Sequence, residues 1–336
     1  MKTIKFLRFF LMFAAITSMV LVGCEKDDDD DNNSPTPPTS APYQNLNDDS
    51  TSAITVAIPR IDVTGSRDGA LGIYLSATNQ DGWAFSQFTS GNFIIEITNL
   101  SNEVTSTVAI ISFVNISTQG GNIGAAMTLD YSGSMSSSDI TNMETAVKYF
   151  ANLKASNDQI ALVKFASAAE YTLPFTVHAQ DVITAVDAPY TGSGGSTAWY
   201  NAIDLGLDEA NLLPTSMIPA IIAFTDGYDN NSNVSQSDVI AKANQFQIPI
   251  YTLGFGGANQ TAMETIATST GGSYLYAPDS HQLDALYQKI NGQLKNLYMA
   301  NVTFVGVGNY LVTVTVTYVC QTGTLSSAGT KGFTYP

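Results

Sequence analysis

The feature that most constrains the fold is a regular alternation of apolar runs with helical segments between residues 122 and 297. The apolar runs are nearly continuous, as expected of parallel strands buried on both faces, and they cover residues 124–129, 159–166, 217–224 and 248–255. Helical spacing appears in two sets of residues that would each share one face: Ile140, Met143, Val147 and Phe150, and Leu283, Leu286, Ile290, Leu294 and Leu297. N-caps are expected at Ser138 or Asp139 and at Asp279 or Ser280. This alternation predicts an α/β fold with a doubly wound, mostly parallel, Rossmann-like sheet.

The segments on either side of this region have a different texture. Before it, β-rich runs at 53–58, 72–77, 92–97 and 106–114 are separated by Gly, Asn, Asp and Ser turns. After it, residues 301–307 and 310–319 alternate apolar and polar side chains around a Gly-Asn turn. We therefore expect the two flanks, residues 51–118 and residues 299–336, to pair into one small all-β sandwich, with the α/β domain at 119–298 inserted between them.

The N-terminus has the pattern of a secretory signal. Three basic residues within the first eight positions precede the apolar run 9–22, which is short for a transmembrane anchor, the alternative interpretation. The sequence Leu21-Val22-Gly23-Cys24 resembles the lipobox of bacterial lipoproteins. This resemblance implies a signal peptide at 1–23 and a lipid attached to Cys24. The acidic and Pro-rich segment 24–50 cannot bury a core and is expected to be a solvated tether.

Charge limits the class of partner. Removal of residues 1–23 would leave 10 Lys and Arg against 29 Asp and Glu, since the removed segment holds three basic residues and no acidic one. Nucleic acid is therefore excluded as a partner, because phosphate binding depends on clustered basic residues. The run Lys26-Asp27-Asp28 resembles a lipoprotein export signal, which implies a lipid-anchored protein on the exposed face of the outer membrane; a plain solvated linker is the alternative.

Polar residues gather where the strands of the α/β region end. Asp130-Tyr131-Ser132-Gly133-Ser134 follows the first strand, and Thr225-Asp226-Gly227 follows the strand at 217–224. Between them, Gly194-Gly195-Ser196-Thr197 opens a helix. Each piece alone could be a capping turn, an ordinary turn or a linker. Together they favour a metal site, because ligands of doubly wound sheets bind off the carboxyl ends of the strands where the strand order reverses.

The same residues resemble the von Willebrand factor A family, whose metal-ion-dependent adhesion site (MIDAS) reads D-x-S-x-S, then Thr, then Asp. The resemblance covers residues 122 to about 297 and implies that the metal ligands are Asp130, Ser132, Ser134, Thr197 and Asp226. Hydroxyls and carboxylates are ligands of hard cations, so Mg²⁺ is the expected cofactor, with Mn²⁺ or Ca²⁺ as alternatives. Glycines at 133, 194, 195 and 227 are expected to let the loops approach one ion.

The resemblance also implies a function. In the family, an acidic residue of the partner completes the shell of the cation, so we expect a cell-surface lipoprotein that binds a protein or extracellular-matrix ligand and touches the membrane only through its lipid. The alternative is a structural or assembly module of the cell envelope. A metal-dependent hydrolase is disfavoured, because no G-x-S-x-G or H-E-x-x-H motif occurs, and we expect no catalytic residues and no enzymatic activity. Asp229 could help to hold a second cation, or it belongs to an exposed polar loop.

Overall fold

The computed structural model describes residues 43–44, 50–63, 69–119, 121–278, 280–320 and 323–336. Cys24, the predicted signal peptide and nearly all of the predicted tether lie outside the described residues. Among the described residues, no helix is both long and apolar enough to cross a membrane. The described residues from 43 onward belong to one compact unit.

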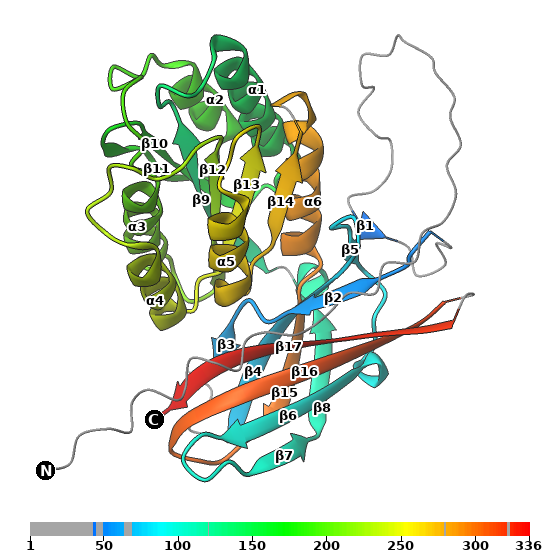
Figure 1. Ribbon diagram of the computed structural model, residues 1–336. Helices are drawn as coiled ribbons and strands as arrows, with labels where there is room; N and C mark the ends of the chain where they lie inside the picture. The colour runs from blue at the N-terminus through cyan, green and yellow to red at the C-terminus, as the bar shows by residue number, and fades with distance from the viewer. Residues whose placement is uncertain (1–42, 45–49, 64–68, 120, 279, 321–322) are drawn as a thin grey trace, which may run out of the picture. The chain divides into compact units, whose positions relative to one another are not determined.

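The central region contains a six-stranded sheet with helices on both faces (Figure 1). Its strands are β9 (Asn122–Asp130), β10 (Gln159–Phe165), β11 (Ala169–Thr176), β12 (Met217–Thr225), β13 (Ile250–Phe255) and β14 (Tyr274–Ala277). Its helices are α1 (Ser137–Leu153), α2 (Ala179–Asp187), α3 (Trp199–Ala210), α4 (Gln236–Phe246), α5 (Gln260–Thr270) and α6 (Leu283–Lys295), the last preceded by a 3-10 turn at Ser280–Gln282.

The strand order is β11-β10-β9-β12-β13-β14, in which only the edge strand β11 is antiparallel. The chain runs outward from β9 through β10 to β11, and then returns to the other side of β9 for β12. The order therefore reverses between β9 and β12, which makes their carboxyl ends the switch point of the sheet. The predicted doubly wound, mostly parallel fold is confirmed.

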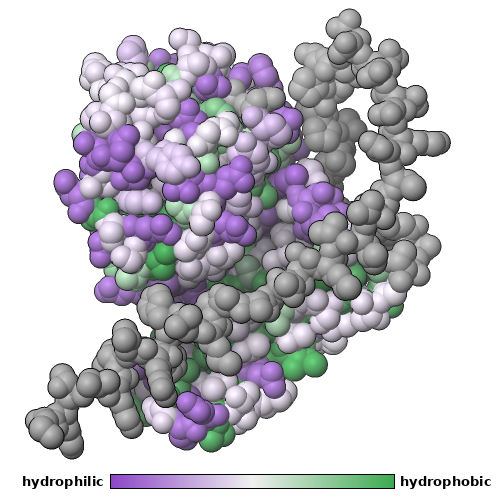
Figure 2. Space-filling view, in the orientation of Figure 1, coloured by the Kyte–Doolittle hydropathy of each residue, from purple (hydrophilic) through white to green (hydrophobic). Residues whose placement is uncertain are grey.

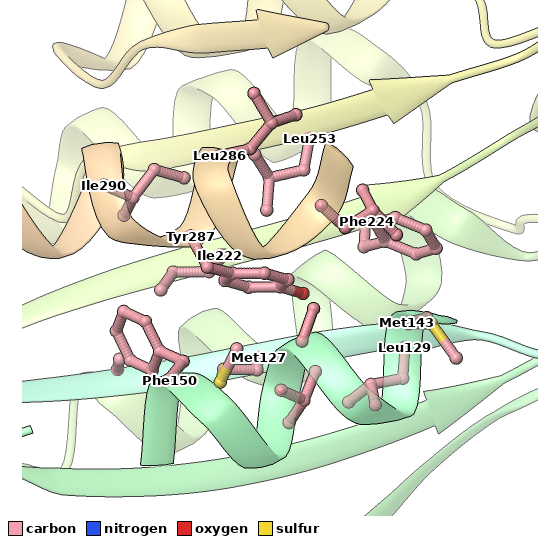
Figure 3. Packing of buried hydrophobic residues seen from close by; sticks show 14 of the residues in the cluster. Met127, Leu129, Met143, Phe150, Ile222, Phe224, Leu253, Leu286, Tyr287 and Ile290 are labelled. Carbon is pink, nitrogen blue, oxygen red and sulfur yellow. The ribbon is translucent and has the colours of Figure 1, made fainter. Parts of the chain in front are cut away.

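Alternate residues of the buried strands point to opposite faces of this sheet and build two cores. Met127, Leu129, Ile222 and Leu253 pack against α1, α2 and α6, whereas Ala126, Val163 and Ile221 pack against α3, α4 and α5. Figure 3 shows the first core, in which side chains of α1 and α6 lie over the sheet and the rings of Phe150 and Tyr287 are 5.8 Å apart. The visible surface over the helices is a mixture of hydrophilic and intermediate residues with scattered hydrophobic ones (Figure 2).

The helix α1 begins two or three residues earlier than the sequence suggested. Its N-cap is Ser136, whose side chain accepts a hydrogen bond from the backbone of Asp139, and Asp139 bonds back to the backbone of Ser136. The expected caps Ser138 and Asp139 are therefore the second and third helical residues. This reciprocal capping box satisfies two N–H groups that would otherwise lack partners.

The flanking segments form two further sheets, and each contains strands from both ends of the chain. Their strands are β1 (Tyr43–Gln44), β2 (Ile54–Ala57), β3 (Ile61–Asp62), β4 (Ala70–Asn79), β5 (Ala84–Phe85), β6 (Phe93–Asn99), β7 (Thr105–Val108), β8 (Ile110–Asn115), β15 (Tyr298–Thr303), β16 (Gly308–Cys320) and β17 (Gly323–Tyr335); short 3-10 turns lie at Ser90–Asn92 and Ile116–Gln119. One sheet has the order β1-β5-β4-β15-β8, with β2 and β3 also paired to β4, and the other has the order β17-β16-β6-β7. One apolar cluster draws side chains from both sheets.

One sequence expectation within the flanks is wrong, and the positions where the chain changes sheets are new. Residues 106–114 do not form one strand. Ala109 separates β7 from β8, and these two strands belong to different sheets. The runs on either side of the Gly-Asn turn belong to different sheets: β15 pairs with β4 and β8, and β16 pairs with β6 and β17. At both positions the chain passes from one sheet to the other. An alternation of apolar and polar residues does not reveal which sheet a strand joins.

Lys331 on β17 is an unusual core residue, since its side chain is only 6% exposed. Its Nζ donates to the carbonyl oxygen of Thr270 at 2.8 Å, at the end of α5. Burial lowers the pKa of Lys331 to about 8. In the unfolded chain the pKa is about 10.4, so between these values the unfolded state binds more protons and stability rises with pH.

We therefore expect the free energy of unfolding of the wild type to rise relative to that of Lys331→Met between pH 7 and pH 10. The difference should approach about 3 kcal/mol, the free energy of the pKa shift. Urea unfolding of both proteins at both pH values measures it, and titrating tyrosines cancel in the comparison. Equal pH dependence of the two proteins would show that Lys331 carries no such shift.

Candidate metal centre

Three loops meet at the switch point of the central sheet. The first follows Asp130, the last residue of β9; the second lies just before α3 and contains Thr197; and the third follows β12 and begins at Asp226. Because β9 and β12 are adjacent parallel strands, their carboxyl ends place the first and third loops side by side. The sheet topology therefore explains why residues almost a hundred positions apart are neighbours.

Asp130 is the most deeply buried polar residue of the site, with 0% exposure. Its Oδ1 accepts a hydrogen bond from the backbone N–H of Ser132 at 2.7 Å, and its Oδ2 accepts one from the hydroxyl of Thr225 at 2.6 Å. Burial raises the pKa of Asp130 to about 6; the negative charge of Asp226 adds to this shift, and the hydrogen bonds oppose it only in part. The raised pKa shows that burial disfavours the ionised form of this carboxyl group. A positive charge beside it would stabilise the ionised form.

Hydroxyl groups connect the first loop to the third. The Oγ atoms of Ser132 and Ser134 are 3.1 Å apart, and the Ser134 hydroxyl donates to Oδ1 of Asp226 at 2.7 Å. Partial burial raises the pKa of Asp226, and the nearby charge of Asp139 adds to this effect. The two carboxylates therefore flank a pair of serine hydroxyls.

Thr197 completes the group from the second loop, with only 4% exposure. A Cβ added to Gly227 would lie 3.3 Å from Oγ of Ser134 and 3.8 Å from Oγ1 of Thr197, so both hydroxyls face the same point of the third loop. The structure thus brings together all five residues that the sequence singled out.

Sequence reasoning missed Thr225, the last residue of β12. Its hydroxyl donates to Asp130 and accepts the backbone N–H of Gly227 at 3.1 Å, so it connects the first and third loops. Its position directly before Asp226 in the Thr-Asp-Gly sequence was the available signal, because a side chain adjacent to a strand-end carboxylate lies at the same edge of the sheet.

The first and second loops touch through their backbones. The N–H of Gly133 donates to the carbonyl oxygen of Gly195 at 3.0 Å, and the N–H of Gly194 donates to the carbonyl of Tyr131 at 2.7 Å. A Cβ at Gly133 would lie only 2.9 Å from the Gly195 oxygen, and Gly195 has a φ of +79° that other residues rarely adopt. Glycine is therefore required at both positions for this approach.

Asp229 does not contribute to the group of five. Its carboxylate accepts hydrogen bonds from the backbone N–H of Tyr200 at 2.9 Å and from the hydroxyl and backbone N–H of Ser232. One of these hydrogen bonds caps α3, and the other two lie within the loop. The polar loop that contains Asp229 is therefore ordered against α3.

The donor set suits a hard divalent cation. Two carboxylates and three hydroxyls offer only oxygen atoms, and these are the ligands that Mg²⁺, Mn²⁺ and Ca²⁺ prefer. No group of three or more His, Cys, Asp and Glu side chains with metal-binding geometry occurs in the part of the chain that the structure describes. Three neutral hydroxyls take the place of such groups here, and a cation among them would offset the unfavourable burial of Asp130.

Comparison with known protein families now decides the identity of this region. Residues 126–289 match the family model of the von Willebrand factor type A domain. The chain contains a von Willebrand factor type A (VWA) domain. The match begins within β9 and ends within α6, so it includes all three loops of the site.

Solved structures with VWA-like folds are similar to this chain at low identity. A von Willebrand factor type A protein from Catenulispora acidiphila is 11% identical over 84% of this chain and 73% of its own, with a TM-score of 0.47. The conserved hypothetical protein BatB from Bacteroides thetaiotaomicron is 20% identical over 52% of this chain and 100% of its own, with a TM-score of 0.44. None of these similarities assigns a ligand or partner to this chain.

A matrix protein of the mussel byssus, proximal thread matrix protein 1, is also similar. It is 17% identical over 51% of this chain, with a TM-score of 0.47, and the match spans only 47% of the mussel chain. Another structure of that mussel protein has a zinc occupied MIDAS motif. The search of curated proteins found no match.

Proposed function

We propose that this chain is a cell-surface lipoprotein whose VWA domain binds a protein or matrix ligand through a divalent cation. The ligands of the cation are Asp130, Ser132, Ser134, Thr197 and Asp226, and Mg²⁺ is the favoured ion, with Mn²⁺ or Ca²⁺ as alternatives. The observation that carries the proposal is the convergence of five oxygen-bearing side chains from three loops at the switch point of the sheet.

The exposure of the five residues suits binding of a partner rather than enclosure of the ion. Asp130, Ser132 and Thr197 are buried, whereas Ser134 is exposed and Asp226 is half-buried. When bound, the cation supplies a Lewis-acidic position that a carboxylate of the partner can fill. The buried residues hold the site in place, and the exposed rim leaves access from solvent.

The net charge of the chain also indicates which kind of partner it can bind. The chain carries 29 acidic against 13 basic residues and has no arginine after Arg67. Within the VWA domain, Lys148, Lys242 and Lys295 are in ion pairs with Asp residues. A partner's carboxylate therefore approaches a protein with a large net negative charge, and we expect basic residues beside that carboxylate to offset the repulsion.

Attachment to the cell surface rests on the sequence around Cys24 and on the export-like run Lys26-Asp27-Asp28. A lipid anchor of more than one acyl chain holds a protein stably at a membrane without a spanning helix. Protease accessibility on intact cells tests surface exposure, and Cys24→Ser, which removes the acceptor thiol, is the control. If the wild-type protein is cleaved only after the cells are lysed, surface display is contradicted.

The experiment for cation-dependent binding has two stages. Calorimetric titration of the purified protein with Mg²⁺ and Mn²⁺ should show uptake of one ion, and an immobilised panel of matrix proteins and glycans should then retain the protein in Mg²⁺ but not in EDTA. Binding that is insensitive to EDTA would point to the β-rich segments as the working surface. Absence of cation uptake would remove the proposed function.

A further inference from the structure

The helix α3 begins immediately after Ala198, but its own sequence does not cap it. The N-cap residue is Ala198 itself, which has no side-chain acceptor. The first N–H groups of a helix lack intrahelical partners and are usually satisfied by the side chain of the N-cap residue. Acceptors for the start of α3 must therefore come from elsewhere in the chain.

The loop after β12 supplies these acceptors from about thirty residues away. The carbonyl Oδ1 of Asn230 accepts the N–H of Thr197 at 2.8 Å. Asp229 and Ser232 accept the N–H groups of Tyr200 and Asn201, each at 2.9 Å. Two N–H donors in the first turn of α3, and the N–H of Thr197 just before its N-cap, are thus satisfied by three side chains of one loop.

Asn230 forms hydrogen bonds with both the N–H and the carbonyl oxygen of Thr197. Besides accepting the Thr197 N–H, Asn230 donates its own backbone N–H to the Thr197 carbonyl oxygen at 3.0 Å. These two hydrogen bonds fix the backbone orientation of Thr197 and therefore the direction of its side chain. Thr197 is buried, with 4% exposure. No contact between Asn230 and the carboxylates of the site is needed for this effect.

The same loop begins at Asp226. One end of it therefore carries one member of the oxygen cluster, and four residues later its Asn230 fixes another member, Thr197, by hydrogen bonds. Displacement of the loop would move Asp226 and Thr197 together. Groups that orient the ligands of a metal through hydrogen bonds raise its affinity by preorganising the site.

We propose that Asn230 is a positioning residue of the cation site, which sets the Thr197 hydroxyl in place through its paired hydrogen bonds with the Thr197 backbone. This inference rests on the proposed function, because it assumes that the five oxygen-bearing residues hold a cation. It assigns to the polar loop 229–232 a role in cation affinity in addition to helix capping.

The test compares Asn230→Ala with the wild type by calorimetric titration with Mn²⁺ and by urea unfolding without metal. Loss of an orienting group of this kind lowers metal affinity by about 10- to 100-fold, and we expect a loss in this range. Asn230→Asp should restore affinity, because a carboxylate oxygen can accept the Thr197 N–H in the same way. It also provides a second variant if Asn230→Ala does not fold.

Two controls separate positioning from simple helix capping. Ser235→Ala removes the N-cap of α4, where the Ser235 hydroxyl accepts the N–H of Asp238, and should cost stability while leaving Mn²⁺ affinity unchanged. Asn233→Ala changes an exposed asparagine of the same loop and should alter neither quantity.

The outcomes distinguish the two proposals. If Asn230→Ala loses stability but binds Mn²⁺ as tightly as the wild type, Asn230 is only a cap and the inference is wrong, although the cation site stands. If Asn230→Asp binds as weakly as Asn230→Ala, the hydrogen bond to Thr197 is not the cause. If the wild type takes up no Mn²⁺, the proposed function and this inference both fail.

Discussion

Replacement of Asp130 by Asn is expected to abolish cation binding and, at the same time, to stabilise the metal-free protein. Asp130 is completely buried and its pKa is raised to about 6, whereas an unfolded Asp has a pKa of about 3.9. The folded state therefore holds a proton more tightly than the unfolded state, and ionisation at pH 7 costs stability. Removal of the charge should recover up to about 2–3 kcal/mol.

The cation reverses this balance in the wild type. An ion that binds only the folded state stabilises it by about 2.7 kcal/mol when its free concentration is a hundred times its Kd. Thermal unfolding with and without Mg²⁺ should thus show a rise in Tm for the wild type and none for Asp130→Asn, which starts from a higher Tm. Asn keeps the size of the side chain, so the difference reports on charge rather than on packing.

A matched control is Asp208→Asn, which removes an exposed carboxylate that pairs with Lys242 near the carboxyl end of α3, the end of that helix away from Thr197. We expect this variant to keep the full Mg²⁺-dependent gain, because exposed ion pairs contribute little to stability. A clear Mg²⁺-dependent gain in Asp130→Asn would contradict the assignment of Asp130 as a ligand.

The position of the site could be predicted from sequence because the sheet topology makes it simple. Parallel strands end at one edge, so Asp130 after one buried strand and Asp226 after another are expected to be neighbours once a doubly wound order is inferred. The structure brings Ser132, Ser134 and Thr197 to the same place. Each polar residue could be recognised from its own short stretch of sequence, and the fold brings these stretches together.

The support around the site could not be predicted in the same way. Local capping rules favour Ser196 or Thr197 as the N-cap of α3, but the N-cap is Ala198, whose side chain has no acceptor. The true acceptors, such as Asn230, lie in a loop that reads as an ordinary polar turn until its partner helix is known. Capping over such a distance depends on tertiary structure.

The β-rich flanks were harder for a related reason. The strand β17 (Gly323–Tyr335) is rich in Gly, Ser and Thr and lacks an apolar run, yet it pairs along its whole length with β16. Its existence depends on the neighbouring strand rather than on its own propensity. The domain boundaries drawn from the sequence, and the lipid anchor at Cys24, stay predictions.

Substitution of Gly133 by Ala is expected to weaken cation binding by about tenfold or more, because the added methyl group forces the first and second loops apart. Its Cβ would lie 2.9 Å from the carbonyl oxygen and 3.3 Å from the nitrogen of Gly195, and both atoms belong to a backbone that cannot rotate aside. The first and second loops must therefore separate by a few tenths of an ångström. This movement carries Ser132 and Ser134 away from Thr197, while crowding of this kind costs about 1–3 kcal/mol.

Gly257→Ala is the matched control, because it adds the same methyl group in a neighbouring loop. Its Cβ would lie 3.6 Å from the Asp226 carbonyl oxygen, an ordinary contact, and Gly257 does not have a positive φ. Titration with Mn²⁺ should show wild-type affinity for Gly257→Ala and a large loss for Gly133→Ala. If both variants bind Mn²⁺ like the wild type, then the close approach of the two loops is not what places the hydroxyls around the ion, and Thr197 need not be a ligand.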